Sequence, residues 1–86
     1  MISTENLWIE AKLEAERARS LYPNPDHLTL ALAEEAGEVT KAVLDNFDNK
    51  CDIYEVRKEI IQCVAMCIRL WGEGDPTVNL DPVPHR

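Results

Sequence analysis

The sequence predicts an all-α protein, in which three main helices form a helical bundle completed by oligomerisation, followed by an irregular, Pro-containing C-terminal tail. Apolar residues recur at three- and four-residue steps in three long segments, and polar or Pro-rich turns separate these segments. No stretch shows the alternation of apolar and polar residues that is typical of a half-buried strand. We therefore expect one helical domain over residues 1–74 and an extended or mobile tail over residues 75–86.

The first helix is expected to begin near Ser3 or Thr4, either of which can cap it, and to end before Pro23. Small residues dominate its inner stripe, which consists of Leu7, Ala11, Ala15, Ala18 and Tyr22. The charged residues beside this stripe are most simply a solvated face, and they are Lys12, Glu14, Glu16, Arg17 and Arg19. Trp8 lies off the stripe, where it can stack on a nucleotide base or, as Trp more often does, pack in a core or interface.

The second helix is expected from Leu28 to about Asn46, with Asp26 or Asn24 as its N-cap and His27 in its first turn. Glu35 lies near the middle of its apolar arc and Glu38 on the edge of that arc. The apolar residues within about 80° of Glu35 are Leu28, Ala31, Leu32, Val39, Ala42 and Val43. Because an ionised carboxylate is costly to remove from water, such a group is normally paired, protonated or bound to a metal.

The third helix is expected over residues 53–71, after a capping box formed by Asp52 and Glu55. Glu59 lies on its apolar face, with Glu55 one turn before it and Gln62 one turn after it. If the second and third helices pack antiparallel, their acidic patches meet in one pocket, where the carboxylates would raise one another's pKa values. A divalent cation removes this conflict, and a dense set of hard oxygen ligands suits Mg²⁺ or Mn²⁺.

Composition narrows the range of partners. The net charge of −7 argues against a nucleic acid polymer and against an anionic membrane. There is no signal-peptide pattern and no apolar run of transmembrane length. Three cysteines without a CxxC pair fit a reducing compartment, so we expect a cytoplasmic protein. Wide apolar arcs in a chain of 86 residues suggest that another subunit buries part of this surface.

Two motifs carry a family resemblance: Glu34-Glu35-Ala36-Gly37-Glu38 in the second helix and Glu59-x-x-Gln62 in the third. This order resembles the MazG-like all-α nucleoside triphosphate pyrophosphohydrolases, most of all their short single-domain members from phages and prophages. The resemblance covers roughly residues 28–70. It implies hydrolysis of (d)NTPs between the α and β phosphates to NMP and pyrophosphate, with Mg²⁺ held by the acids of both motifs. It also implies a homodimer or homotetramer.

Carried over by position, the resemblance assigns roles to individual residues. The metal ligands would be Glu35, Glu38, Glu59 and Gln62, where Gln62 occupies the place of the family's aspartate. A carboxylate, Glu38 or Glu34, would take the proton from the attacking water. The nearest cations for the phosphates are Lys41, Lys58 and Arg69, each of which can equally be an exposed helix charge, and Trp8 is the candidate for the base.

Gln62 leaves three interpretations open. Its amide oxygen can ligate the metal, or Glu55 can replace it from one turn earlier, or catalysis has been lost and the chain is a nucleotide- or metal-binding helical oligomer of the same fold. A different alternative is a helical adaptor in which Glu35 and Glu59 pair with Arg or Lys across an interface.

Overall fold

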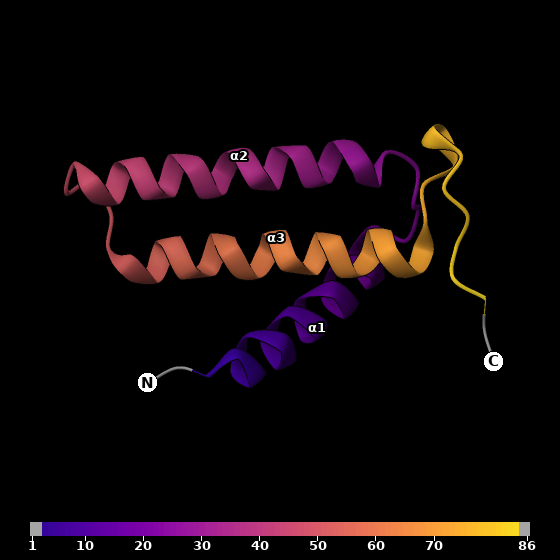
Figure 1. Cartoon of the computed structure of the whole chain (residues 1–86), viewed down its shortest axis with the longest axis horizontal. Coiled ribbons are helices and arrows are strands. Elements are labelled where there is room, and N and C mark those ends of the chain that lie inside the picture. Colours follow the sequence, from indigo (N-terminus) through magenta and orange to yellow (C-terminus); the bar gives the residue numbers. More distant parts are fainter. Residues whose placement is uncertain (1–2, 85–86) are drawn as a thin grey trace.

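The computed structural model describes residues 3–84, and these residues form an all-helical fold (Figure 1). Its elements are α1 (Thr4–Leu21), α2 (Leu28–Phe47), α3 (Ile53–Glu73) and a short 3₁₀ turn, η1 (Pro76–Val78). The predicted all-α class and all three predicted helices are confirmed. The outer limits of the expected domain and tail, at residues 1–2 and 85–86, lie outside the described part of the chain.

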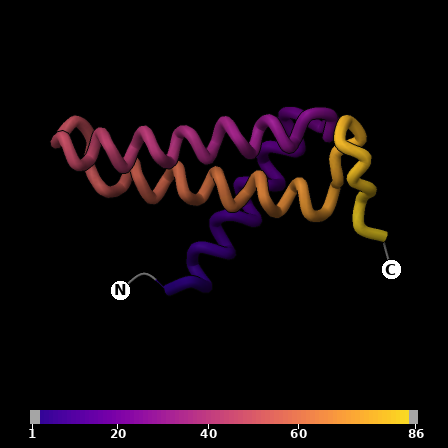
Figure 2. The backbone as a smooth tube through the Cα atoms, turned by 45° about the horizontal axis from the view of Figure 1, so that its top comes forward, coloured from indigo at the N-terminus to yellow at the C-terminus, as the bar shows by residue number. Residues whose placement is uncertain are grey.

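α3 is the central helix of the three. It packs against α2 along the length of an antiparallel hairpin, and α1 crosses its other side at an angle (Figures 1 and 2). The N-terminal half of α1 diverges from the hairpin, whereas its C-terminal half lies against α3 (Figure 1). This arrangement places the apolar arcs of α2 and α3 face to face, and with them the carboxylates that those arcs contain.

Two of the predicted helix caps are confirmed. The hydroxyl oxygen of Ser3 accepts a hydrogen bond from the backbone N–H of Asn6 at 3.3 Å and caps α1. A carboxylate oxygen of Asp52 accepts from the backbone N–H of Glu55 at 3.1 Å and caps α3. Both caps act over three residues, which is the local geometry that the sequence pattern predicts.

The predicted cap of α2 is wrong. His27 is the N-cap residue rather than a first-turn residue, and it adopts a left-handed conformation with φ 69° and no capping bond from its side chain. Asn24 accepts a hydrogen bond from the N–H of Asp26 within the link. The cap instead comes from Asp75, whose carboxylate accepts hydrogen bonds from the backbone N–H groups of His27 and Thr29.

The C-terminal segment, which was expected to be extended or mobile, folds into a turn. After Gly74, residues 75–80 form a closed turn that contains η1 and an isolated antiparallel bridge between Asp75 and Leu80. Further along, the backbone N–H of Val83 donates to the carbonyl of Gly72 at 3.0 Å. The segment therefore folds back against the end of α3 and the start of α2.

The buried core of the chain is small. Its apolar members are mostly alanines and comprise Ala11, Ala15, Ala18, Leu28, Ala42, Val56 and Ala65. Ala11, Ala15 and Ala18 form the predicted inner stripe of α1, but Tyr22, which was expected to continue it, is 71% exposed because the helix has ended. In the part of the chain that the structure describes, no helix has the length and apolar character needed to cross a membrane.

Candidate functional site

Glu35 is the central residue of the candidate site. It lies on the face of α2 that packs against α3 and is half-buried, as the phase of its apolar arc predicts. Its Oε2 atom is shielded from solvent and has no hydrogen-bond partner among residues 3–84. Burial raises the pKa of its carboxyl above the ordinary value, and the negative charges of Glu59, Glu38, Glu34 and Glu14 raise it further.

The acidic patches of α2 and α3 meet, as their antiparallel packing predicts. Glu59 on α3 is half-buried and is the strongest of the charged groups that raise the pKa of Glu35. Gln62, one turn further along α3, is also half-buried and lines the same cavity as Glu35. An unpartnered carboxylate oxygen, a second carboxylate and a neutral amide are thus gathered between the two helices.

This cavity has a volume of about 340 Å³, and residues of all three helices line it. α1 contributes Glu14, Arg17 and Ala18, and the α1–α2 link contributes Tyr22, Asn24, Asp26 and His27. α2 then lines it from Leu28 to Glu35, and α3 from Gln62 to Arg69. A cavity of this size suits a small molecule, and its wall combines carboxylates with guanidinium and imidazole groups.

Two residues of the cavity wall, Glu14 and Arg17, were expected on a solvated face. The Glu14 side chain is only 22% exposed, and both carboxylate oxygens accept hydrogen bonds from the guanidinium of Arg17. The hydrogen bond from Arg17 lowers the pKa of Glu14. A signal was present, because Glu14 lies three residues after Ala11 and four before Ala18, a spacing that places it beside the buried stripe.

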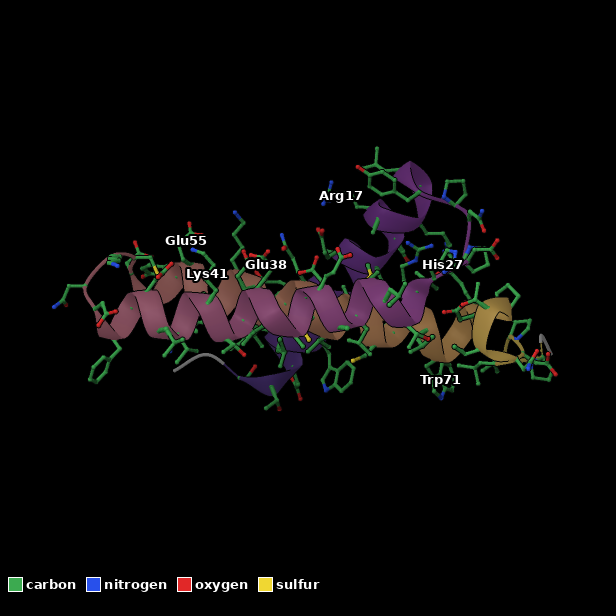
Figure 3. All side chains as sticks on the ribbon, turned by 90° about the horizontal axis from the view of Figure 1, so that it is seen from above. Arg17, His27, Glu38, Lys41, Glu55 and Trp71 are labelled. Atoms are coloured by element: carbon green, nitrogen blue, oxygen red, sulfur yellow. The ribbon has the colours of Figure 1, made fainter. Side chains whose placement is uncertain are left out.

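The remaining predicted acids lie at the margin of the site. Glu34 and Glu38 are exposed, and Glu38 lies on the edge of the α2–α3 pair that also carries Lys41 and Glu55 (Figure 3). Arg17 and His27 lie on this same side, whereas Trp71 points away on the opposite side (Figure 3). The charge of Glu38 therefore still raises the pKa of Glu35, although the Glu38 side chain is exposed to solvent.

The three predicted phosphate-binding cations each face a carboxylate on their own helix. Lys41 donates to Asp45 at 2.7 Å, and Lys58 lies 4.0 Å from Glu55. Arg69 lines the cavity but is buried, and its guanidinium donates to Glu73 and to the backbone carbonyl of Tyr22. The candidate for the base, Trp8, is 52% exposed and does not line this cavity.

The side-chain oxygens between α2 and α3 suit Mg²⁺ only as an open site, in which substrate phosphates and waters supply the other ligands. Within residues 3–84, no three His, Cys, Asp or Glu side chains converge as a closed metal site would require. Mg²⁺, however, is commonly bound by one or two carboxylates together with substrate phosphates and waters. The pair Glu35 and Glu59, with the amide oxygen of Gln62, matches that open kind of site, and the unpartnered Oε2 of Glu35 is the atom that most needs such a partner.

Comparison with family models, curated proteins and solved structures finds no match to this chain. Its function is therefore inferred from the residues of the cavity and from the two acidic motifs.

Proposed function

We propose that this protein is a Mg²⁺-dependent nucleoside triphosphate pyrophosphohydrolase, which cleaves (d)NTPs between the α and β phosphates to give NMP and pyrophosphate. The observation that carries the proposal is Glu35, a half-buried carboxylate with an unpartnered oxygen, a raised pKa and a second carboxylate beside it. Such a group opposes folding, so its presence favours a functional role. The resemblance of both acidic motifs to those of the MazG-like family supports the same reaction.

In this proposal, Glu35, Glu59 and the amide oxygen of Gln62 would hold a Mg²⁺ or Mn²⁺ ion. The ion, when bound, supplies positive charge that neutralises the phosphate oxygens and polarises the anhydride. This role explains why Glu35 and Glu59 lie close enough to repel each other although neither forms an ion pair among residues 3–84. It also agrees with the net charge of −7, because a triphosphate approaching an acidic protein needs a cation.

The hydrolysis itself needs a proton acceptor. A water oxygen forms a bond to one phosphorus of the α–β anhydride, the bond from that phosphorus to the bridging oxygen breaks, and the proton of the water passes to a carboxylate. We assign this proton transfer to Glu38, which lies at the exposed edge beside Glu35, with Glu34 as the other candidate.

The three free cysteines support the cytoplasm as the compartment of this reaction.

The negative charge of the phosphates also needs partners. Arg17 pairs with Glu14, but it is the best placed cation because it lines the cavity and its side chain is 60% exposed, whereas that of Arg69 is 3% exposed. Arg69 lines the same cavity, but its guanidinium donates to Glu73, so its main role is to stabilise the wall of the cavity. Lys41, Lys58 and Trp8 remain predicted contacts for phosphate and base.

The proposal is tested by measuring pyrophosphate release from a panel of NTPs and dNTPs with Mg²⁺ or Mn²⁺, and again after chelation. We expect metal-dependent turnover that falls by at least about 100-fold in Glu35→Gln and in Glu38→Gln. Glu16→Gln is the matched control, because it removes an equivalent charge from the exposed face of α1 and should leave turnover unchanged. Absence of pyrophosphate from every nucleotide, with the fold intact, contradicts the proposal.

A second candidate function is a nucleotide- or metal-binding module of the same fold. Gln62 favours it, because a neutral amide stands where the family has an aspartate, and the described residues contain no third converging acid. This candidate predicts that Mg²⁺ with a nucleotide raises the melting temperature while no pyrophosphate is released.

A further inference from the structure

A second cavity lies on another side of the molecule from the candidate site. Its volume is about 590 Å³, and its walls are the second half of α1, the C-terminal end of α3, the prolines of the α1–α2 link and residues 82–84. Trp71, on its α3 wall, points to the side opposite Arg17 (Figure 3). Of the described residues, only Arg69 lines both cavities, and its side chain is 3% exposed. The two cavities are therefore separate spaces divided by a buried guanidinium.

The walls of the second cavity are held in place by the backbone. Pro23 and Pro25 line one side of it, Pro82 and Pro84 line another, and each proline ring locks its own φ. The N–H of Val83 donates to a backbone carbonyl at the end of α3 at 3.0 Å, which fixes the C-terminal wall. A ligand would therefore meet a preformed site and lose little binding energy to the ordering of the protein.

Trp71 supplies a flat apolar surface at this cavity. It is 72% exposed, although Trp is among the residues with the most apolar area to gain from burial. Ile68 lines the same α3 wall and extends the apolar surface. An exposed indole can stack on a planar ring, and stacking of this kind binds nucleobases with little regard to which base is present.

The α1 wall of the cavity carries two cations. Lys12 and Arg19 are exposed, and neither forms an ion pair within the described part of the chain. Two acids also line the cavity, but Glu73 accepts hydrogen bonds from Arg69, so Glu16 is the acid that remains. The wall is thus locally positive in a chain of net charge −7, which favours an anionic group at this place.

We propose that this cavity binds a nucleoside monophosphate, with the base stacked on Trp71 and the phosphate held by Lys12 and Arg19. The two cations lie seven residues apart, so their Cα atoms are separated by about 10 Å along α1, and their long side chains can approach one phosphate from both sides. A cavity of this volume suits a molecule of nucleotide size. A nucleic acid polymer fits less well, because the rest of the acidic chain would repel its backbone.

The inference rests on the second cavity alone. A nucleoside monophosphate is also a product of the proposed reaction, but neither Glu35 nor a metal ion has a part in this binding. The second cavity can therefore be tested without turnover and in the presence of a chelator.

The test is isothermal titration calorimetry of the whole chain with AMP in chelator, where we expect a dissociation constant on the order of 0.1 mM. AMP is the probe because a purine offers a larger ring face than a pyrimidine. Adenosine lacks the phosphate and ribose 5-phosphate lacks the base, so each should bind at least about tenfold more weakly than AMP.

Trp71→Leu should weaken AMP binding by at least about tenfold, and Trp71→Phe, which keeps a smaller ring, should weaken it less. Lys12→Gln and Arg19→Gln should each weaken it by about three- to tenfold, and this loss should shrink as the salt concentration rises. Phe47→Leu and Lys50→Gln are the matched controls, because they remove an exposed ring and an exposed charge that do not line the cavity. Melting temperatures show that each variant is folded.

Arg17→Gln shows which cavity AMP occupies. Arg17 lines the candidate site and not the second cavity, so this variant should bind AMP as the wild type does. A loss of binding in Arg17→Gln together with full binding in Trp71→Leu would assign AMP to the candidate site and overturn the inference.

No binding of AMP up to about 5 mM also overturns it, with equilibrium dialysis as the second measurement because binding can release little heat. Equal affinities for AMP and adenosine, or for wild type and Trp71→Leu, overturn it as well. Pyrophosphate release is measured separately. AMP binding without turnover contradicts only the proposed function, and turnover without AMP binding in the second cavity contradicts only this inference.

Discussion

The buried carboxylate of Asp75 accepts a hydrogen bond of 2.9 Å from the backbone N–H of Thr29, which lies 46 positions earlier in the chain. Its other oxygen accepts from the N–H of His27 and from the N–H and hydroxyl of Thr77. A residue beyond α3 thus satisfies the free N–H groups at the start of α2. Because α2 carries Glu35 two turns later, the C-terminal segment also fixes one wall of the candidate site.

We expect Asp75→Asn to lower the melting temperature by on the order of 10 °C, because an amide cannot accept all of these hydrogen bonds. Burial alone would raise the pKa of Asp75, but the hydrogen bonds from Thr77 and Thr29 outweigh burial and hold the pKa well below its usual range. Its contribution to stability is therefore full above the ordinary aspartate pKa of about 3.9 and is lost as the pH falls toward the lowered pKa.

Thermal unfolding followed by circular dichroism checks this prediction, and the difference between wild type and Asp75→Asn should shrink on acidification. Asp81→Asn, an exposed aspartate in the same segment, is the control and should melt as the wild type does. Equal melting temperatures for wild type and Asp75→Asn at neutral pH would show that this cap is dispensable.

Gly74 and Gly72 offer a matched pair of substitutions at the end of α3. Gly74 has φ 70° and ψ −167°, and a Cβ there would lie 2.3 Å from the carbonyl oxygen of Leu80. Gly74→Ala should therefore cost at least about 2 kcal/mol of unfolding free energy. A Cβ at Gly72 meets nothing within 4 Å, so Gly72→Ala should be neutral or stabilising by up to about 1 kcal/mol. Denaturant titration of both variants measures these values, and equal losses would contradict the close approach at Gly74.

Local signals in the sequence were sufficient for the helices and for two caps. Ser3 and Asp52 each cap a helix through an N–H only three residues away, so a short pattern contains both partners. Asp75 and the start of α2 are brought together only by the folded chain, and no local pattern marks that pairing. For this reason, the sequence favoured the nearby Asp26 or Asn24 as the cap, which is wrong.

Only part of the candidate site was predictable from the sequence. Helical periodicity placed Glu35 on the face of α2 that meets α3, and the structure confirms its burial. Glu14 and Arg17 were assigned to solvent because their surroundings depend on the angle at which α1 crosses α3, which periodicity does not determine. Arg69 was assigned to phosphate, but its position one turn before Glu73 gives it a partner on its own helix.

The raised pKa of Glu35 predicts a trade between activity and stability. Between the ordinary glutamate pKa of about 4.3 and the raised pKa, the folded state binds more protons at Glu35 than the unfolded state does. The contribution of Glu35 to the free energy of unfolding should therefore fall as the pH rises through this interval. Glu35→Gln removes the charge with little change of shape, so it should raise the melting temperature near neutral pH by about 4–8 °C, as about 1 kcal/mol would.

Below the ordinary glutamate pKa, wild type and Glu35→Gln should melt together, since both side chains are then neutral. Thermal unfolding in the absence of divalent cations, repeated across this pH range, gives the comparison. Glu16→Gln serves again as the control, because its exposed carboxylate should show no such dependence. A Glu35→Gln variant less stable than the wild type at neutral pH would mean that the carboxylate has a stabilising partner.

Gln62→Asp tests whether Gln62 lies among the metal ligands. A third carboxylate beside Glu35 and Glu59 adds repulsion, so the variant should melt below the wild type in chelator. Added Mg²⁺ should stabilise the variant more than the wild type, because a cation that binds only the folded state raises its stability by mass action. Gln62→Asn controls for the shorter side chain. Melting temperatures measured across a Mg²⁺ titration decide the matter: equal Mg²⁺ responses in all three proteins would exclude Gln62 from the ligand set.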